Sequence, residues 1–325
     1  MMMSYAALMG ALIGSAAVLW PFESGAQQTF PTHPIRMIVP YAPGGGVDAA
    51  GRVLAGEMAK HLPQPVVVEN RGGAGGVTGS QAVANAAPDG HTVLLVSVIV
   101  VTSQSMMKNP PFNTTKDLKP VSLIGSSPLV LTVHPSLPAK DMKSLVEYAE
   151  ANPGKLNYSS AGAGTTPHLA AELLRMQTGI QVVHVPYRGS ALAMADLVSG
   201  NVQMAFSSMA AALPHMKSGK LRGLATTGAR RAVALPDLPT VIETVPDVEV
   251  DLWIAMFVPA GTPDVIVASL NRSVNQALRS DVVRKGFMLS GQEATGSTPQ
   301  EAQAFIEAEL KKWGRVVRAA KIESK

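Results

Sequence analysis

The chain has 325 residues and a formal net charge of only +4, with 46% hydrophobic and 15% charged residues. These values allow one large or two ordinary domains with a sizeable core, and they argue against intrinsic disorder. Lys and Arg are scattered without a basic stripe, so nucleic acid is not an expected partner, and the absence of cysteine excludes disulfides, thiolate metal sites and cysteine nucleophiles.

The N-terminal residues predict an export signal. Residues 6–20 are apolar and rich in small side chains, a stretch too short to span a bilayer comfortably. Ser24-Gly25-Ala26 then places small residues at the spacing of a cleavage site, although residues 1–5 contain no Lys or Arg. We expect a cleavable signal peptide over residues 1–26 and a periplasmic mature protein, with a retained anchor as the alternative.

A strand, a glycine turn and a helix follow. Residues 35–39 form an apolar run, Gly44, Gly45 and Gly46 break it, and 47–60 is predicted to be a helix. The first N–H groups of a helix lack intrahelical partners and carry partial positive charge, so such a turn binds anions. Glycine also lets a ligand approach the main chain closely. We interpret this turn as half of a site for a small carboxylate.

The rest of the chain alternates strands and helices, which is typical of a doubly wound α/β sheet. Strands are expected at 65–70, 92–101, 121–124, 129–133, 156–159, 181–185, 202–206, 221–226 and 251–258. Helices are expected at 77–86, 141–151, 167–178, 190–199, 264–277, 281–289 and 299–320. A second glycine-rich turn at 160–166 restarts the pattern. We therefore predict two α/β lobes with the ligand between them: 27–126 plus 250–325, and 127–249, linked by strands near 124–132 and 248–257.

Six motifs in order carry a family resemblance: Pro34–Asp48, Pro65–Gly76, Ala87–Gly90, Pro186–Ser190, Ser218–Arg222 and Pro259–Pro263. Over residues 30–320 the chain resembles the Bug, or tripartite tricarboxylate transporter, family of periplasmic substrate-binding proteins. The resemblance implies a two-lobed, type II binding-protein fold that closes on a small organic carboxylate and delivers it to an inner-membrane permease. It also implies that main-chain groups and ordered waters between Ala42–Asp48 and Ala161–Thr166 hold the carboxylate.

Side chains at the two turns allow structural or ligand roles. Asp48 is interpreted chiefly as a first-turn carboxylate that orders the turn, because it would repel a ligand carboxylate; direct contact is the alternative. Tyr41 is expected to face the cleft rather than the lobe core. Thr165 and Thr166 can cap their helix and also contact the ligand.

Other positions refine the ligand. Arg188 is expected to be solvated; if it faces inward, it suits a second carboxylate. Ser207 and Ser208 stand where the family often has an acidic residue, which argues against an amino-acid ligand. His168 is the one histidine that we place near the site, and no histidine spacing predicts a metal. The glycine run at 72–76 is interpreted as a tight turn that lets the next helix pack closely.

The predicted ligand-binding residues are Tyr41, Pro43, Gly44, Gly45, Gly46, Asp48, Ser97, Ala161, Gly164, Thr165, Thr166, His168, Arg188 and Ser207, with no metal, cofactor or catalytic residue. No nucleophile elbow or other catalytic motif is present in the sequence. The chain is expected to be a monomeric receptor for a mono-, di- or tricarboxylate, aromatic acids included, that serves a tripartite tricarboxylate permease. A receptor for a sensor kinase and a nucleotide-dependent α/β enzyme are the alternatives.

Overall fold

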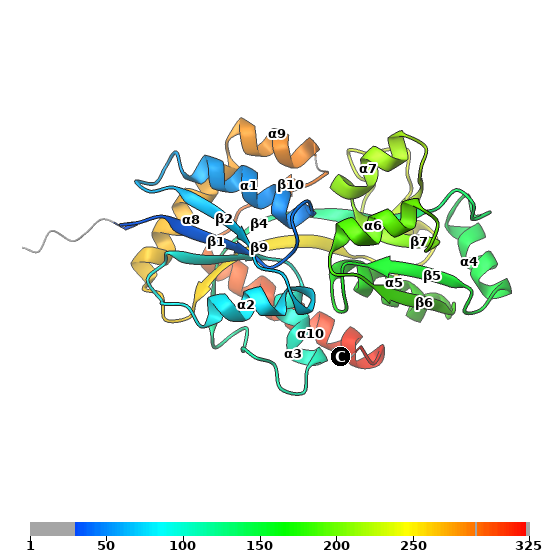
Figure 1. The fold of residues 1–325 in the computed structure, drawn as a ribbon, viewed down its shortest axis with the longest axis horizontal. Coiled ribbons are helices and arrows are strands. Elements are labelled where there is room, and N and C mark those ends of the chain that lie inside the picture. Colours follow the sequence, from blue (N-terminus) through cyan, green and yellow to red (C-terminus); the bar gives the residue numbers. More distant parts are fainter. Residues whose placement is uncertain (1–29, 290, 323–325) are drawn as a thin grey trace, which may run out of the picture.

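The computed structural model describes residues 30–289 and 291–322, so the predicted signal peptide at 1–26 lies outside the described residues. Two lobes lie side by side and are joined by two long strands, β4 (Leu118–Val133) and β9 (Asp251–Pro259) (Figure 1). No helix in the described part of the chain combines the length and apolarity needed to cross a bilayer.

The first lobe is built on the strand order β2-β1-β3-β9-β4. The central strand β1 (Ile35–Val39) pairs in parallel with β2 (Val66–Asn70) and β3 (Thr92–Val96). β9 is antiparallel to both β3 and β4, and the short β10 (Glu293–Ala294) pairs with β4. Parallel strands aim their carboxyl ends at one edge of the sheet, where turns into helices meet.

The second lobe continues the sheet through the last part of β4. Residues 129–133 pair with β7 (Met204–Ser208) and with β8 (Arg222–Thr226), both antiparallel. β5 (Leu156–Ser160) lies between β7 and β6 (Val182–Pro186) and is parallel to both. β4 thus belongs to both lobes.

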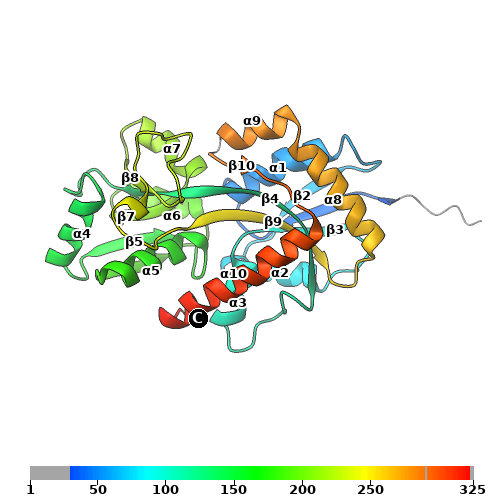
Figure 2. The ribbon, with the colours of Figure 1, turned by 180° about the vertical axis from the view of Figure 1, so that it is seen from behind.

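Helices cover both faces of each lobe. In the first lobe, α1 (Gly46–Met58), α8 (Asp264–Leu278) and α9 (Asp281–Leu289) lie on one face; α2 (Val77–Ala84), α3 (Ile99–Met106) and α10 (Pro299–Ala319) lie on the other (Figures 1 and 2). The second lobe carries α4 (Met142–Ala151), α5 (Thr166–Thr178), α6 (Ser190–Val198) and α7 (Met209–Lys217). Two 3-10 turns, η1 (Ala74–Gly76) and η2 (Val241–Glu243), complete the elements.

One apolar core runs through both lobes, and a smaller cluster lies under α6 and α7. Long α10 crosses the back of the molecule (Figure 2). Two indole N–H groups, from Trp253 of β9 and Trp313 of α10, donate to the same Glu309 oxygen, each at 2.6 Å. These bonds satisfy a buried carboxylate and fix α10 against the linking strand.

The predicted elements differ from the structure in several places. The strand predicted at 92–101 ends at Val96, and the apolar residues after it begin α3. The two strands predicted at 121–124 and 129–133 form one strand, β4, which continues through Pro128 with register shifts earlier in the strand. The helix α7 has no counterpart in the predicted elements. Apolar runs alone do not separate strand from helix, and Pro214 within α7 disfavours a helix assignment.

Candidate ligand-binding site

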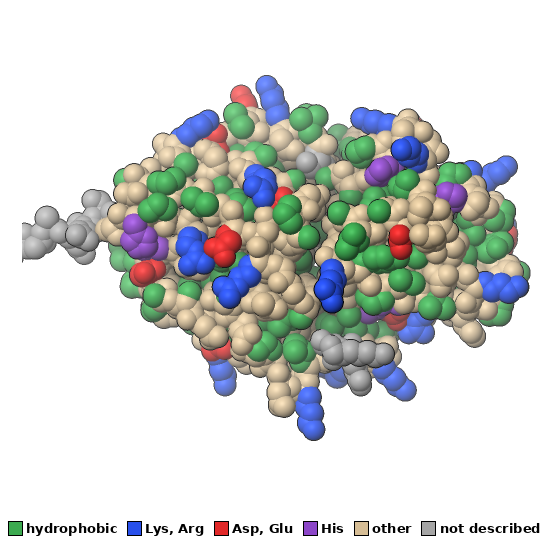
Figure 3. All heavy atoms as spheres, viewed as in Figure 1, with side chains coloured by type: hydrophobic (Ala, Val, Ile, Leu, Met, Phe, Trp, Pro, Cys, Tyr) green, Lys and Arg blue, Asp and Glu red, His purple; other side chains and the backbone are tan. Residues whose placement is uncertain are grey.

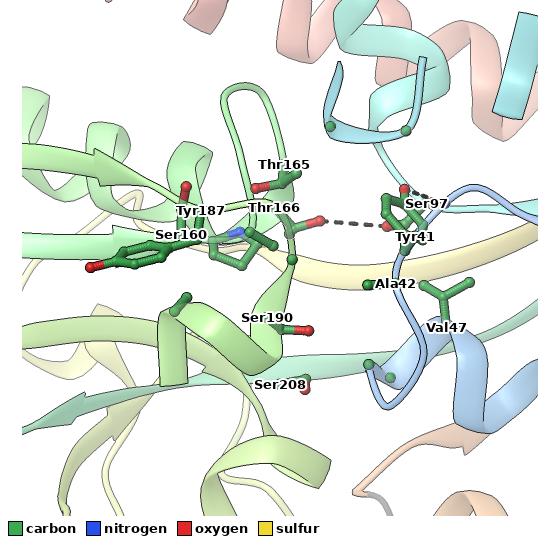
Figure 4. A pocket seen from close by; sticks show the side chains of 18 of the residues that line it. Tyr41, Ala42, Val47, Ser97, Ser160, Thr165, Thr166, Tyr187, Ser190 and Ser208 are labelled. Atoms are coloured by element: carbon green, nitrogen blue, oxygen red, sulfur yellow. Dashed lines mark hydrogen bonds between the residues drawn. The ribbon is translucent and has the colours of Figure 1, made fainter. Parts of the chain in front are cut away.

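A cavity of about 750 Å³ lies between the lobes, a size common for small-molecule sites. The first lobe lines it with the β1–α1 turn, the loop 72–76 and Ser97–Val98. The second lobe contributes residues 159–161, 165–167 and 187–190 together with side chains of α6, β7 and α7. Figure 4 shows Tyr41 and Ser97 facing Thr166 across this space. The cavity thus draws on both lobes.

Six helices begin at this cavity. The residues that precede their first turns all line it: Gly45 for α1, Gly76 for α2, Val98 for α3, Thr165 for α5, Gly189 for α6 and Ser208 for α7. None of the six receives a side-chain cap.

Two helices that begin elsewhere are capped by side chains, whereas α8, which also begins elsewhere, is not. α4 and α10 each start with a capping box, formed by Asp141 with Ser144 and by Thr298 with Glu301. At the cavity, by comparison, the partial positive charge of six helix termini is left without a capping side chain. This arrangement attracts an anion.

Asp48 organises the β1–α1 turn. Its carboxylate accepts hydrogen bonds from the Gly44 N–H at 2.9 Å, from Asn70 Nδ2 at 2.8 Å and from Arg52 Nε at 3.1 Å. Burial by itself would raise the pKa of Asp48, but the bonds from Arg52, Gly44 and Asn70 outweigh it and lower the pKa. Asn70 also donates to the Tyr41 carbonyl at 3.1 Å, so one network fixes both sides of the turn.

Two stacked histidines lie beneath the second turn. His168 Nδ1 accepts the Gly164 N–H at 2.9 Å, so this nitrogen is unprotonated, and the ring stacks on His184 with centroids 3.9 Å apart. Ser160 Oγ lies 2.7 Å from His184 Nε2. Burial lowers the pKa of His168 to about 4 and that of His184 to about 3. A neutral histidine pair therefore supports the turn over a wide pH range.

The two lobes touch at the cavity. Ser97 Oγ and Thr166 Oγ1 lie 3.4 Å apart, and Thr102 Oγ1 donates to the Gly164 carbonyl at 3.0 Å. On the first-lobe side, the Ser97 N–H donates to the Tyr41 hydroxyl at 3.3 Å, and burial raises the pKa of Tyr41. The two lobes are therefore in direct polar contact at the cavity.

Most predicted site residues come together in the cavity lining: Tyr41, Pro43, Gly45, Gly46, Asp48, Ser97, Ala161, Thr165, Thr166, Arg188 and Ser207. Gly44, Gly164 and His168 lie outside the lining. The N–H groups of these two glycines are bound by Asp48 and His168, respectively. Ligand contact by any of these residues stays a prediction.

Thr165 and Thr166 do not cap α5 with their side chains. Thr165 Oγ1 instead donates to the Gly162 carbonyl at 2.7 Å and closes the turn on itself. The Thr165 hydroxyl therefore holds the shape of the turn, and the N–H groups of Gly162, Gly164 and Thr165 are bonded within the protein.

Sequence reasoning missed part of the lining. The loop 72–76 lines the cavity. It also packs closely against neighbouring side chains, as expected, because a Cβ on Gly76 would lie 2.9 Å from Ile99 and 3.0 Å from the Tyr41 ring. Its position directly after β2 was the available signal. The apolar residues Ala193, Met194 and Phe206 also line the cavity, and nothing local in the sequence marks them.

Charge is sparse at this site. Asp48 and Arg188 are the ionisable lining residues apart from two tyrosines, and Arg188 is exposed and takes part in no ion pair within the described residues. Figure 3 shows acidic and basic side chains scattered over one face without a patch of one sign. Because Asp48 is paired with Arg52, the unpaired charge at the cavity is positive.

One group of potential metal ligands lies away from the cavity, at His33, Asp89 and His91. The two imidazole rings are stacked 3.6 Å apart at 19°, so their in-plane lone pairs run side by side rather than toward one point. His91 Nε2 already accepts the Thr32 N–H at 3.1 Å. This arrangement does not suit metal coordination.

Comparison with known proteins identifies the family and confirms the fold class. The family model of the tripartite tricarboxylate transporter family receptor matches residues 50–322. The chain is 38% identical to protein BugT of Bordetella pertussis over 315 residues, 96% of each chain. The structure of the periplasmic binding protein BugD matches with a TM-score of 0.86 at 32% identity, covering 91% of this chain and all of BugD (100%). An R. palustris protein solved with adipate matches with a TM-score of 0.86 at 33% identity, over 90% of this chain and 99% of that one.

These matches confirm the predicted fold class, a two-lobed α/β periplasmic binding protein. They extend over nearly the whole described chain and include both lobes around the cavity. The chain belongs to the tripartite tricarboxylate transporter receptor family and is a periplasmic solute-binding protein of that family.

Proposed function

We propose that this protein captures a small organic carboxylate between its lobes and delivers it to a tripartite tricarboxylate-type permease in the inner membrane. The observation that carries the proposal is the convergence of six uncapped helix N-termini on one cavity. Main-chain N–H groups there provide donors and partial positive charge for a carboxylate, and they require no charged side chain.

The proposal extends to the lobes and to export. Residues 27–126 and 250–325 form one lobe and 127–249 the other, after removal of a signal peptide at 1–26. A ligand that contacts both lobes favours the closed arrangement over the open one by its extra affinity for the closed form. The closed form is then the species that the permease recognises.

The lining residues divide by role in this proposal. Tyr41, Pro43, Ser97 and the main chain of 45–48 and 165–166 face the ligand, with Arg188 at the exposed wall. Gly44, Gly164 and His168 position the two turns, because their polar groups bond within the protein. An R. palustris relative was solved with adipate, which supports a carboxylate as the ligand. The relatives are binding proteins, and we propose no catalytic step.

Calorimetry of the mature chain tests this function. The panel contains mono-, di- and tricarboxylates and aromatic acids, each titrated at fixed ionic strength. We expect one-to-one binding of at least one acid, and a ligand at 100 times its Kd should stabilise the protein by about 2.7 kcal/mol. Absence of binding across the panel would contradict the proposal. Mass spectrometry of small molecules released from freshly purified protein identifies the natural ligand.

A pair of glycine variants on α1 provides the control. Gly46→Val adds a side chain where a Cβ already lies 3.3 Å from Gln292 and 3.5 Å from Ser208, and should abolish binding. Gly56→Val lies on the same helix with nothing within 4 Å of its Cβ, and should bind normally. Uptake by cells that lack the gene, restored by the wild-type chain but not by Gly46→Val, tests delivery to the permease.

A further inference from the structure

A methionine of the first lobe packs on a glycine of the second lobe. Met106 ends α3 and is 6% exposed, and Gly164 lies in the turn before α5. A Cβ on Gly164 would overlap Met106 Sδ and would lie 2.7 Å from its Cε, closer than packed carbon atoms come. The N–H and the carbonyl of Gly164 are bonded to His168 and Thr102, so this backbone is fixed against the thioether.

A methionine of the second lobe makes the reciprocal contact with the first. Met209 begins α7 and is fully buried, and Gly291 follows α9. A Cβ on Gly291 would overlap Met209 Sδ and would lie 2.9 Å from its Cγ. The Gly291 N–H donates to the Met288 carbonyl, which ties this glycine to the end of α9. We call these two interlobe contacts, Met106 on Gly164 and Met209 on Gly291, the methionine seats.

The methionine seats lie on two sides of the cavity. α3 and α9 cover opposite faces of the first-lobe sheet (Figures 1 and 2). Gly164 directly precedes Thr165, Met209 directly follows Ser208, and both of these neighbours line the cavity. The methionines and glycines of the seats themselves do not line it. The seats therefore join the lobes beside the cavity without forming its wall.

Separation of the lobes would uncover both seats. Met106 and Met209 would each lose the glycine that covers them, whereas Met58 would stay in the core of the first lobe. A similar contact, between Met216 and Gly223, lies within the second lobe and would not separate. In a protein that closes on its ligand, exposure of the two seat methionines is thus coupled to the open state.

A thioether that becomes exposed can be oxidised. Hydrogen peroxide transfers one oxygen atom to the sulfur: the O–O bond breaks, an S–O bond forms, and the sulfur loses two electrons as the peroxide is reduced to water. The resulting sulfoxide is polar and carries an extra atom on the sulfur. It opposes closure against a glycine that has no room for one methyl group. A sulfoxide reductase reverses the step with two thiols, which form a disulfide and release water.

We propose that Met106 and Met209 are sites of reversible oxidation, at which sulfoxide formation blocks closure and switches ligand capture off. This regulation rests on the proposed function, because it requires closure that depends on a ligand. It acts beside the cavity and leaves the lining intact. The open, ligand-free protein is the reactive form, and a bound ligand protects both sulfur atoms.

Oxidation mapping tests the exposure step. The mature chain is treated with hydrogen peroxide in the absence and presence of adipate, or of a tighter acid from the calorimetry panel, and tandem mass spectrometry quantifies each methionine. We expect Met106 and Met209 to be oxidised several-fold faster without the acid. Met176 and Met288, 43% and 60% exposed, should react equally in both conditions, and buried Met58 should react in neither.

Substitution of the seats tests the effect on capture. Met106→Leu/Met209→Leu keeps apolar side chains at the seats but cannot form a sulfoxide, and Met176→Leu/Met288→Leu is the matched control with both seats intact. Each protein is titrated before and after oxidation, so effects of the substitutions themselves cancel. Oxidation should weaken binding at least about tenfold in the wild type and the control, and less than about twofold in the seat variant. A methionine sulfoxide reductase should restore binding by the oxidised wild type.

Met194 provides an internal check, because it lines the cavity and remains in the seat variant. If oxidised seat variant loses affinity as the wild type does, oxidation acts at another methionine and the proposal is wrong. Equal oxidation of Met106 and Met209 with and without the acid would show that the seats do not open, and would also contradict it. In both cases the carboxylate-binding function stands. If the unoxidised chain binds no carboxylate, the function and the switch are both contradicted.

Discussion

Asp48 lies in the first turn of α1, 3% exposed, and its carboxylate holds together Gly44, Arg52 and Asn70. An aspartate at this position usually stabilises a helix start through charge and capping. Here its bonds reach back to the glycine turn and across to the end of β2, so one side chain shapes the first-lobe side of the cavity.

Asp48→Asn should destabilise the protein and change its response to acid. The pKa of Asp48 is lowered from 3.8, so its stabilising contribution is present above the unfolded-state pKa and is lost as pH falls through the folded value. We expect a loss of about 1–2 kcal/mol in urea unfolding at pH 7 and a smaller loss at pH 3.

Asp264→Asn is the control for Asp48. The Asp264 side chain is 95% exposed in its ion pair with Lys119, so its removal should cost less than about 1 kcal/mol. Equal losses for Asp48→Asn at pH 7 and pH 3 would show that the charge of Asp48 does not matter.

The buried histidine pair predicts a second pH effect. Burial, with a smaller contribution from the Arg175 charge, lowers the pKa of His168 from 6.5 to about 4, so the folded state binds fewer protons than the unfolded chain between these values. Stability should therefore be full above about pH 6.5 and should fall as pH drops toward 4. His184 acts in the same direction, because its pKa is also lowered, to about 3.

His168→Asn isolates this effect. The amide oxygen can accept the Gly164 N–H as Nδ1 does but cannot titrate, so Tm should decline less between pH 6.5 and 4 while ligand affinity at pH 7 stays within about threefold. His168→Leu, which offers no acceptor, should lose affinity. The exposed His61→Asn should leave the pH profile unchanged. A His168→Asn profile as steep as that of the wild type would rule out this residue as the source.

At the scale of elements, the loop that includes η1 belongs to the first lobe and closely approaches a turn of the second lobe. Gly75 has φ of +67°, and a Cβ there would lie 3.1 Å from the Ala163 carbonyl of the second-lobe turn. The backbone of one lobe thus approaches the other at a residue without a side chain, and the loop contributes to the cavity wall from the first lobe.

Gly75→Ala should oppose closure. The strain of a positive φ costs about 1 kcal/mol of stability, and the added methyl pushes on the Ala163 carbonyl only when the lobes are closed. We expect ligand affinity to fall about tenfold in calorimetry. Gly154→Ala is a close match for strain, with φ of +72° and nothing within 4 Å of its Cβ, and should keep wild-type affinity. Similar affinities for the two variants would contradict an interlobe role for η1.

Strands and helices that a short stretch of sequence marks on its own were predicted well. Strands such as β1 and β2, and helices such as α5 and α8, follow from apolar runs bounded by Gly or Pro. The break placed between 124 and 129 was wrong because Gly-Ser-Ser-Pro is typical of a turn, whereas pairing with β9 keeps these residues in the strand.

In the site, too, the features that were predicted have a local sequence signal, and the features that were missed depend on tertiary packing. The two turns were found because glycines at strand ends mark them in the sequence. The positions of Ser190 and Ser208 opposite Gly45 and Gly46 were not predicted, because they depend on how α6 and α7 pack. Contacts between segments about 150 residues apart in sequence leave no local pattern to read.

At the scale of the whole molecule, β4 is the strand that pairs in both lobes, β9 runs beside its first part, and β4 changes register near Pro120 and Leu123. Irregular pairing of this kind lets strands bend. Opening would separate Ser97 from Thr166 and Thr102 from Gly164 while both sheets stay intact. Few polar contacts of this kind need to break, so a ligand with contacts in both lobes can control the equilibrium.

The crystal structure of the mature chain with its bound carboxylate ligand tests the central claim most directly. We predict a carboxylate in the interlobe cavity whose oxygens lie about 2.7–3.2 Å from main-chain N–H groups of both the β1–α1 turn and the turn at 161–166, directly or through one ordered water. A carboxylate bound outside this cavity, or held by one lobe alone, would contradict the account.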